Sequence, residues 1–194
     1  MIKDVKEAYF YIVNKENIGL AESFSVNPSS CENSKFYKEY LTFTALSDQK
    51  SGRCTTHLFV DEENQEIMGF ISLRASSLIS RNERDGMLGE PAIEISVLAV
   101  NQDYERRGVG RTLVNFAIAE AAELHNNHIG VRYLILAADP KAESFYKKMD
   151  FVPMNELYQM PKEGWSAHCL PMLLALDFEL ENAVTFVDDD DEEE

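Results

Sequence analysis

The chain has 194 residues, of which 45% are hydrophobic and 27% are charged. This length fits one compact domain with its own core, and this composition excludes a disordered chain. No apolar run has membrane length and the N-terminus shows no apolar signal segment, so we expect a cytoplasmic protein without a membrane partner.

The chain is acidic, with 18 basic and 34 acidic residues and a net charge of -16. Its last seven residues are all acidic, so 27 acidic residues oppose the 18 basic ones in the rest, for a net charge of -9. We expect residues 1–180 to form a single domain and residues 181–194 to be a disordered acidic tail. Because a negative surface repels phosphate backbones, nucleic acid is disfavoured as a partner and basic amines or peptides are favoured.

The first half of the chain predicts a helix and a hairpin. Residues 5–18 are too densely apolar to separate helix from strand. Apolar residues recur every three or four positions over residues 34–45, which predicts an amphipathic helix. Two short β-rich runs, at residues 57–60 and 67–73, predict an antiparallel hairpin. Residues 75–91 contain several serines and glycines and a proline, so we expect a loop there.

The second half of the chain alternates strand and helix. Residues 133–138 are nearly all apolar, which predicts a strand buried on both faces, and Pro140 then stands in the first turn of a helix. Strands are predicted at residues 92–100, 133–138, 151–158 and 172–178, and helices at residues 109–124 and 140–149.

Two glycines, Gly108 and Gly110, stand directly before the first of these helices. Backbone N–H groups at the positive end of a helix can converge on an anion there, since no Cβ obstructs its approach. A dinucleotide-binding motif would need a third glycine at Leu113, and a P-loop would need Gly-Lys-Ser/Thr. The alternative interpretation is a tight turn into the helix without a ligand.

The surrounding residues resemble the GNAT superfamily of acetyl-CoA-dependent N-acetyltransferases. After the strand Val97-Leu-Ala-Val100, the run Arg106-Arg-Gly-Val-Gly-Arg111 is similar to the family's acetyl-CoA motif, Q/R-x-x-G-x-G/A. Glu105 stands where the family prefers Gln or Arg, so the backbone is expected to carry the binding.

A second motif lies downstream, where residues 139–151 are similar to the family's N-x-x-A-x-x-h-Y-x-x-x-G-F ending. Asp139 replaces the Asn and Asp150 replaces the Gly, and Asp can cap a helix as Asn does. Together the two motifs cover residues 92–152.

The resemblance implies an α/β (α+β) protein with the GNAT fold. Its central sheet is mixed but mostly antiparallel, is flanked by helices, and contains a parallel pair, residues 94–100 and 133–138, that splays apart. The implied co-substrate is acetyl-CoA, and no metal is expected. The residues expected to bind acetyl-CoA are Leu98, Ala99, Val100, Arg106, Arg107, Gly108, Val109, Gly110, Arg111, Asp139 and Phe145.

Two residues are candidates for acid–base catalysis. Acetyl transfer to an amine requires a base for the amine proton and an acid for the leaving thiolate. Glu94 lies on the central strand where some family members hold a carboxylate base, acting directly or through water. Tyr146 stands where the family often keeps a tyrosine near the thioester sulfur, and a phenol is protonated at neutral pH. The alternatives are a polar strand face for Glu94 and a packed aromatic for Tyr146.

The histidines and cysteines predict no metal site and no disulfide framework. His125 and His128 lack a third and fourth ligand in register, and three cysteines without a CxxC pair are typical of reduced thiols.

The resemblance implies transfer of acetyl from acetyl-CoA to a primary amine, of a small molecule or of a protein, by direct attack. Residues 20–73 also faintly resemble the toxin branch of the superfamily, which acetylates aminoacyl-tRNA, although the negative charge argues against docking of tRNA. A non-catalytic acyl-CoA sensor or interaction module is a third alternative, supported by Glu105 and Asp150. A homodimer is left open.

Overall fold

The structure, a computed structural model, describes residues 7–81, 87–155, 158–159 and 168–176. Its strands are β1 (Ala8–Ile12), β2 (Thr55–Asp61), β3 (Glu66–Arg81), β4 (Met87–Val100), β5 (Tyr133–Ala138), β6 (Val152–Pro153), β7 (Tyr158–Gln159) and β8 (Leu170–Ala175). Its helices are α1 (Ser34–Glu39), α2 (Ala45–Ser51), α3 (Val109–Asn127) and α4 (Glu143–Lys147), with short helical segments η1 (Ile18–Ser23), η2 (Tyr40–Thr44), η3 (Gln102–Tyr104) and η4 (Pro140–Ala142).

The eight strands of these residues form one sheet, in the order β1-β2-β3-β4-β5-β8-β6 with β7 beside β3. β4 and β5 run parallel, and every other neighbouring pair is antiparallel. The predicted mixed, mostly antiparallel sheet is therefore confirmed. The ambiguous N-terminal run contributes β1, which pairs with β2.

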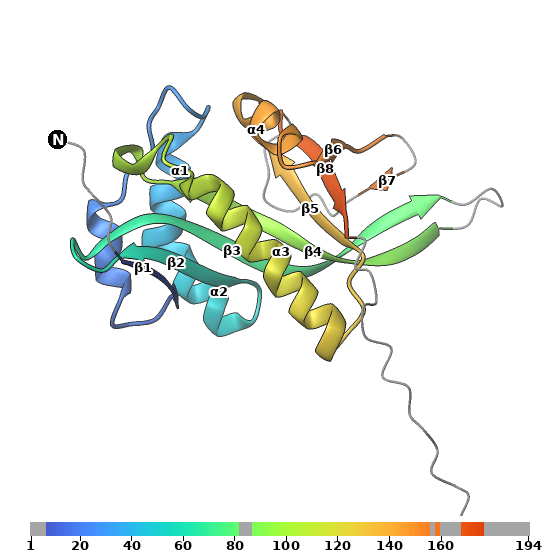
Figure 1. Cartoon of the computed structure of the whole chain (residues 1–194), viewed down its shortest axis with the longest axis horizontal. Helices are drawn as coiled ribbons and strands as arrows, with labels where there is room; N and C mark the ends of the chain where they lie inside the picture. The colour runs from blue at the N-terminus through green and yellow to red at the C-terminus, as the bar shows by residue number, and fades with distance from the viewer. Residues whose placement is uncertain (1–6, 82–86, 156–157, 160–167, 177–194) are drawn as a thin grey trace, which may run out of the picture.

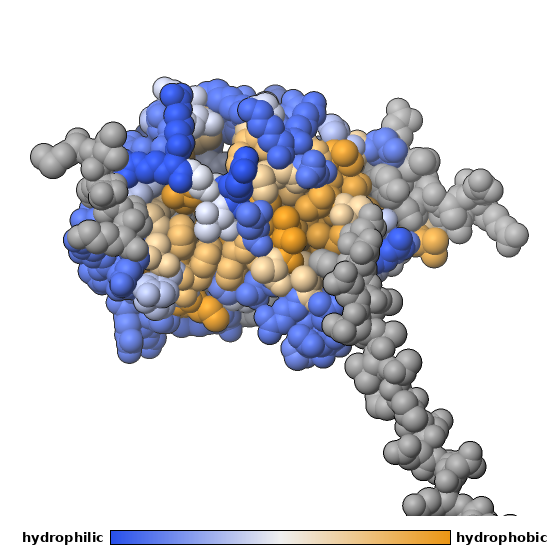
Figure 2. All heavy atoms as spheres, in the orientation of Figure 1, coloured by the Kyte–Doolittle hydropathy of each residue, from blue (hydrophilic) through white to orange (hydrophobic). Residues whose placement is uncertain are grey.

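Helices cover both faces of the sheet. Alternate residues of β3 enter different cores: Ile71 packs with Leu113 of α3, whereas Phe70 packs with Leu41 of η2. Since successive side chains of a strand point to opposite faces, α3 covers one face and η1, α1, η2 and α2 cover the other (Figure 1). Apolar residues gather on the face that α3 crosses, bordered by hydrophilic ones (Figure 2). No helix among the described residues is long and apolar enough to cross a membrane.

The predicted helix over residues 34–45 and the predicted hairpin are both confirmed. The helix begins after Asn33, whose side chain accepts a hydrogen bond from the Phe36 N–H, and it continues through η2 and α2 to Ser51. Gly52 ends it in the left-handed conformation, with φ of 71°.

The prediction of a loop over residues 75–91 is wrong. β3 continues to Arg81 and β4 starts at Met87, and the two strands pair throughout as a long hairpin whose arms extend past the body of the sheet (Figure 1). Leu78 anchors this hairpin, because it is fully buried against Ala92 and Ile135. Long-range pairing and burial override the turn preference of the local serines and glycines.

The parallel pair splays apart as predicted. In the ladder between β3 and β4, Ser72 pairs with Val97 and the next residue, Leu73, pairs with Ile95. Ser96 is therefore an extra residue that forms a bulge in β4. β4 pairs with β5 from Ala92 to Ile95 only. Beyond the bulge, β4 stays with β3 while β5 stays with β8, and a gap opens between them.

The remaining predictions are confirmed in part. The helices predicted at residues 109–124 and 140–149 appear as α3 and as η4 with α4. Strands β6, β7 and β8 lie within or beside the last two predicted runs. Residues 177–194, which include the expected acidic tail, lie outside the described residues.

Candidate active site

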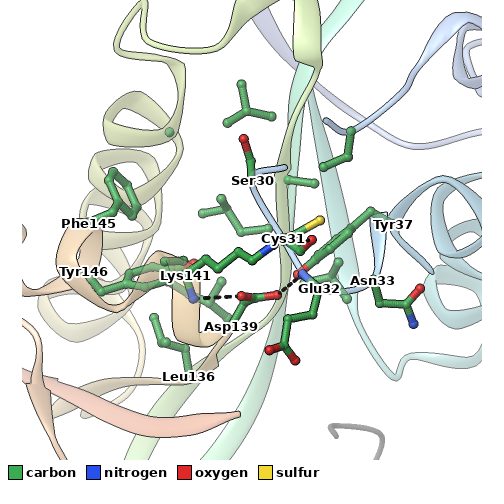
Figure 3. A pocket seen from close by; sticks show the side chains of 18 of the residues that line it. Ser30, Cys31, Glu32, Asn33, Tyr37, Leu136, Asp139, Lys141, Phe145 and Tyr146 are labelled. Carbon is green, nitrogen blue, oxygen red and sulfur yellow. Dashed lines mark hydrogen bonds between the residues drawn. The ribbon is translucent and has the colours of Figure 1, made fainter. Parts of the chain in front are cut away.

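A cleft of about 970 Å³ occupies the gap where β4 and β5 separate (Figure 3). Its walls come from the end of β4, the β4–α3 loop, the β5–α4 turn with α4, the residues that precede α1 with the start of α1, and residues 168–169. The predicted pantetheine-binding residues Leu98, Ala99 and Val100 line it, on the side of β4 that has lost its pairing with β5. The edge of β4 facing the cleft is therefore available to a ligand.

The β4–α3 loop presents the start of α3 to this cleft. Arg106 and Gly108 both have left-handed backbones, with φ of 59° and 83°, and they turn the chain sharply into the helix. Gly108 is the N-cap and makes no side-chain cap hydrogen bond, so the first N–H groups of this 19-residue helix are not capped by a side chain. This geometry suits an anion such as a diphosphate.

The second glycine has a different role from the first. A Cβ on Gly108 would meet no atom within 4 Å, so its left-handed φ is what requires glycine. A Cβ on Gly110 would stand 3.3 Å from the Phe145 ring, which lines the cleft beside it. Gly110 thus lets α4 approach α3 closely.

Of the three arginines predicted to bind phosphate, two line the cleft and one does not. Arg106 and Arg111 line the cleft, as do Val109 and both glycines. Arg107 is not among the lining residues, and its guanidinium lies 5.3 Å from the centre of the Tyr104 ring. Positive charge at this end of the cleft therefore comes from Arg106 and Arg111.

Tyr146 lines the cleft from α4, with its ring packed edge-on to Phe145 and Phe151. Burial, reinforced by the charges of Tyr37 and Asp139, raises the pKa of Tyr146 above its ordinary value of 10.0. Burial likewise raises the pKa of Tyr37, a cleft-lining residue of α1 that the sequence did not single out. Both phenols thus stay protonated at neutral pH.

Asp139 lies in the β5–α4 turn and lines the cleft with both carboxylate oxygens engaged. One accepts the Lys141 N–H at 2.9 Å, as expected of a helix cap, and the other accepts the Glu32 N–H at 2.8 Å (Figure 3). No pattern in the sequence indicates the second contact, because Glu32 and Asp139 are 107 residues apart.

Glu94 is buried in β4 and is not among the residues that line the cleft. Its carboxylate accepts hydrogen bonds from Arg74 at 2.8 Å and from the Ser76 hydroxyl at 3.1 Å, and it is 5% exposed. Ser96, two residues further along β4, does line the cleft. Direct contact between Glu94 and a substrate would require a rearrangement.

Cys31, His168 and Cys169 also line the cleft, although the sequence suggested no role for them. Burial, followed by the charge of Asp139, raises the pKa of the Cys31 thiol. The described residues contain no group of three or more His, Cys, Asp or Glu that could hold a metal.

A sequence profile of the Acetyltransferase (GNAT) family matches residues 17–151, and the chain belongs to this family. It is therefore an acetyltransferase, and this part of the prediction is confirmed.

Solved structures of similar fold include several toxins. One is described as a bacterial toxin, with 18% identity and a TM-score of 0.66 over 88% of this chain and 92% of that chain. AtaTR bound with AcCoA has 19% identity and a TM-score of 0.60, with 88% and 94% covered. AtaT complexed with acetyl-methionyl-tRNAfMet has 16% identity and a TM-score of 0.65, with 85% and 94% covered. At these identities the likeness establishes the GNAT fold.

Proposed function

We propose that this protein transfers the acetyl group of acetyl-CoA to a primary amine, of a small molecule or of a protein or peptide, by direct attack. The observation that carries the proposal is the position of Tyr146. It lines the same cleft as the freed edge of β4, and its hydroxyl makes no hydrogen bond within the part of the chain that the structure describes. A protonated phenol is thus available to a leaving thiolate.

The β4–α3 loop and β4 would hold the co-substrate. Backbone N–H groups at the start of α3, with Arg106 and Arg111 beside them, suit its phosphates, and the free edge of β4 suits its pantetheine arm. Acetyl-CoA supplies an activated thioester. Phe145, held against Gly110, would form an apolar wall for the arm.

Tyr146 would act as the general acid. When the amine nitrogen bonds to the carbonyl carbon and the carbon–sulfur bond breaks, the Tyr146 hydroxyl donates its proton to the sulfur. Its raised pKa keeps that proton in place at neutral pH.

Glu94 would act as the general base through water. The amine must lose a proton, and Glu94 is the carboxylate on β4 closest in sequence to the bulge at Ser96. Because its carboxylate is held by Arg74 and does not line the cleft, the proton reaches it through water beside Ser96.

A cationic acceptor fits the charge of the protein. The net charge is -16, and Glu32 adds an exposed carboxyl group to the cleft wall on the same side as Asp139. An amine that carries a second positive charge would be attracted by this field.

The second candidate function is acetylation of an aminoacyl-tRNA. It is favoured by the fold of the AtaT structure, described as complexed with acetyl-methionyl-tRNAfMet. The net charge opposes it, because each tRNA phosphate would be repelled.

The test measures thiol release from acetyl-CoA in the presence of primary amines, polyamines, lysine peptides and charged tRNA at low salt. We expect turnover with a cationic amine and little with tRNA. Turnover with charged tRNA alone would select the second candidate. Absence of heat in calorimetry when acetyl-CoA is added to folded protein, together with absence of thiol release, would overturn both.

A further inference from the structure

Residues 25–33, here called the bridging segment, cross from one side of the cleft to the other. On the side of the β4–α3 loop, the Gln102 N–H donates to the Ser25 carbonyl at 2.8 Å. The Asn27 side-chain amide donates to the Glu105 carboxylate at 3.2 Å. These bonds fix the start of the bridging segment to the loop that leads into α3.

The end of the bridging segment is fixed to the β5–α4 turn. The Asp139 carboxylate accepts the Glu32 N–H (Figure 3). The Lys141 ammonium donates to the carbonyls of Ser29, at 3.5 Å, and Cys31, at 3.4 Å. The bond to Asp139 is the short one, at 2.8 Å, and its acceptor is a carboxylate. It is therefore the strongest of these contacts.

The chemistry of this contact explains why an acid stands at residue 139. Both carboxylate oxygens accept a backbone N–H, from Glu32 and from Lys141. An asparagine has one oxygen acceptor, and its NH₂ group would face the second N–H, donor against donor. Asparagine could cap the helix but could not hold the bridging segment as well.

The bridging segment connects two parts of the sheet that hydrogen bonds no longer connect. The ladder between β4 and β5 ends at Ile95 and Leu136, and the cleft lies beyond. Residues 30–33 form a wall of that cleft. Their position relative to Tyr146 depends on the contacts at the β5–α4 turn.

We propose that Asp139 is a positioning residue that holds the bridging segment in place as the cleft wall past which the amine approaches Tyr146. The kinetic consequence rests on the proposed function, whereas the structural consequence does not. Releasing the Glu32 N–H lets residues 29–33 move away from the β5–α4 turn. The amine then loses a contact surface, and Cys31, which is 7% exposed, becomes accessible.

The structural test measures alkylation of Cys31 by N-ethylmaleimide in the full chain without acetyl-CoA, read by peptide mass spectrometry. We expect Asp139→Asn to label Cys31 about tenfold faster, as loss of one charge-assisted hydrogen bond implies. Cys54, which directly precedes β2 and is 8% exposed, is the internal reference and should label at the wild-type rate. Asp150→Asn, the same chemical change outside the cleft, is the matched control.

A second variant keeps the test decisive if Asp139→Asn unfolds the protein and exposes Cys54. Lys141→Met removes the ammonium but keeps the backbone N–H that Asp139 caps, and Lys147→Met, which breaks only a surface pair with Glu143, is its control. We expect Cys31 to label faster in Lys141→Met than in the wild type, and at the wild-type rate in Lys147→Met. Unchanged labelling of Cys31 in both Asp139→Asn and Lys141→Met would overturn the proposal.

The kinetic test separates positioning from general damage. We expect Asp139→Asn to raise the KM for the amine several-fold while kcat falls less, with the KM for acetyl-CoA nearly unchanged. A fall in kcat alone, with an unchanged KM for the amine, would overturn the positioning role. If the labelling of Cys31 changes but no amine is acetylated by the wild type, the proposed function fails and the structural part of this inference stands.

Discussion

The two sides of the cleft are built in different ways. The β4–α3 side is local: Arg106, Gly108 and the first turn of α3 are consecutive in the chain, and their backbone conformation makes the site. The β5–α4 side depends on contacts between distant segments, such as the hydrogen bond between Glu32 and Asp139. The first side can form once α3 folds, whereas the second forms only when the N-terminal half docks.

This difference separates two functions. The local side presents backbone N–H groups and arginines, which suit a carrier with phosphates. The distant side presents side chains with protons to give or accept, which suit the chemical step and the acceptor. Substitutions on the local side should therefore change the affinity for acetyl-CoA, and substitutions on the distant side should change kcat or the KM for the amine.

The largest effect is expected at Tyr146. Tyr146→Phe keeps the packing against Phe145 and Phe151 but removes the proton donor, so kcat should fall about a hundredfold or more. The KM for acetyl-CoA should stay near the wild-type value. Steady-state kinetics measure both, with Tyr133→Phe on β5, outside the cleft, as the control. An unchanged kcat would remove Tyr146 from the mechanism.

The pH dependence sharpens this prediction. A general acid must be protonated, and the pKa of Tyr146 is raised above 10.0 by burial. The rate should therefore not fall between about pH 7 and 9 through loss of this proton. A falling limb below pH 9 that Tyr146→Phe abolishes would show that the pKa of the phenol is not raised above its ordinary value and would contradict the effect of burial.

A smaller loss of kcat is expected at Glu94, which lies on neither side of the cleft. Glu94→Gln keeps an oxygen that can accept from Arg74 but cannot take a proton, so kcat should fall roughly tenfold. The thermal midpoint separates this from unfolding, because the variant removes the negative charge that Arg74 contacts at 2.8 Å. If stability falls and kcat per folded molecule does not, Glu94 has a structural role only.

The next largest effect is expected from substitution of the two glycines of the β4–α3 side. Gly108→Ala forces a Cβ into a left-handed conformation at a cost of about 1 kcal/mol, so the loop shifts and the KM for acetyl-CoA should rise about fivefold. Gly110→Ala should have a smaller effect, since the Phe145 ring must move by only a few tenths of an ångström. Gly19→Ala, which meets open space, is the control. Equal kcat losses in all three would mean that the glycines serve folding only.

The sequence predicts the local side well and the distant side poorly, for a physical reason. Gly108 and Gly110 signal a backbone conformation that a few consecutive residues determine, and the structure has that turn. The partners of Asp139 depend on how residues 25–33 dock, which no local pattern encodes. Tyr146 was singled out by its place in the downstream motif, which resembles that of the GNAT family, and it does line the cleft.

The long β3–β4 hairpin and the pairing of Glu94 show the same limit. Ser76 and Ser77 favour turns locally, yet they pair with Ala92 and Pro91 because the neighbouring strand is there to accept them. The position of Glu94 among apolar residues led to the prediction of a catalytic base. Its ion pair with Arg74 supplies a structural reason for its burial, which the sequence alone did not reveal.

The smallest effect distinguishes two neighbouring arginines of the local side. Arg111 lines the cleft at the start of α3, so Arg111→Ala should raise the KM for acetyl-CoA a few-fold, and more strongly at low salt, because an exposed cation is screened by ions. Arg107 stacks on Tyr104 instead, and Arg107→Ala should leave that KM unchanged while lowering the thermal midpoint slightly. Kinetics at two salt concentrations test both variants. Equal increases in KM would place both guanidinium groups at the phosphates and would mean that Arg107 leaves Tyr104 when acetyl-CoA binds.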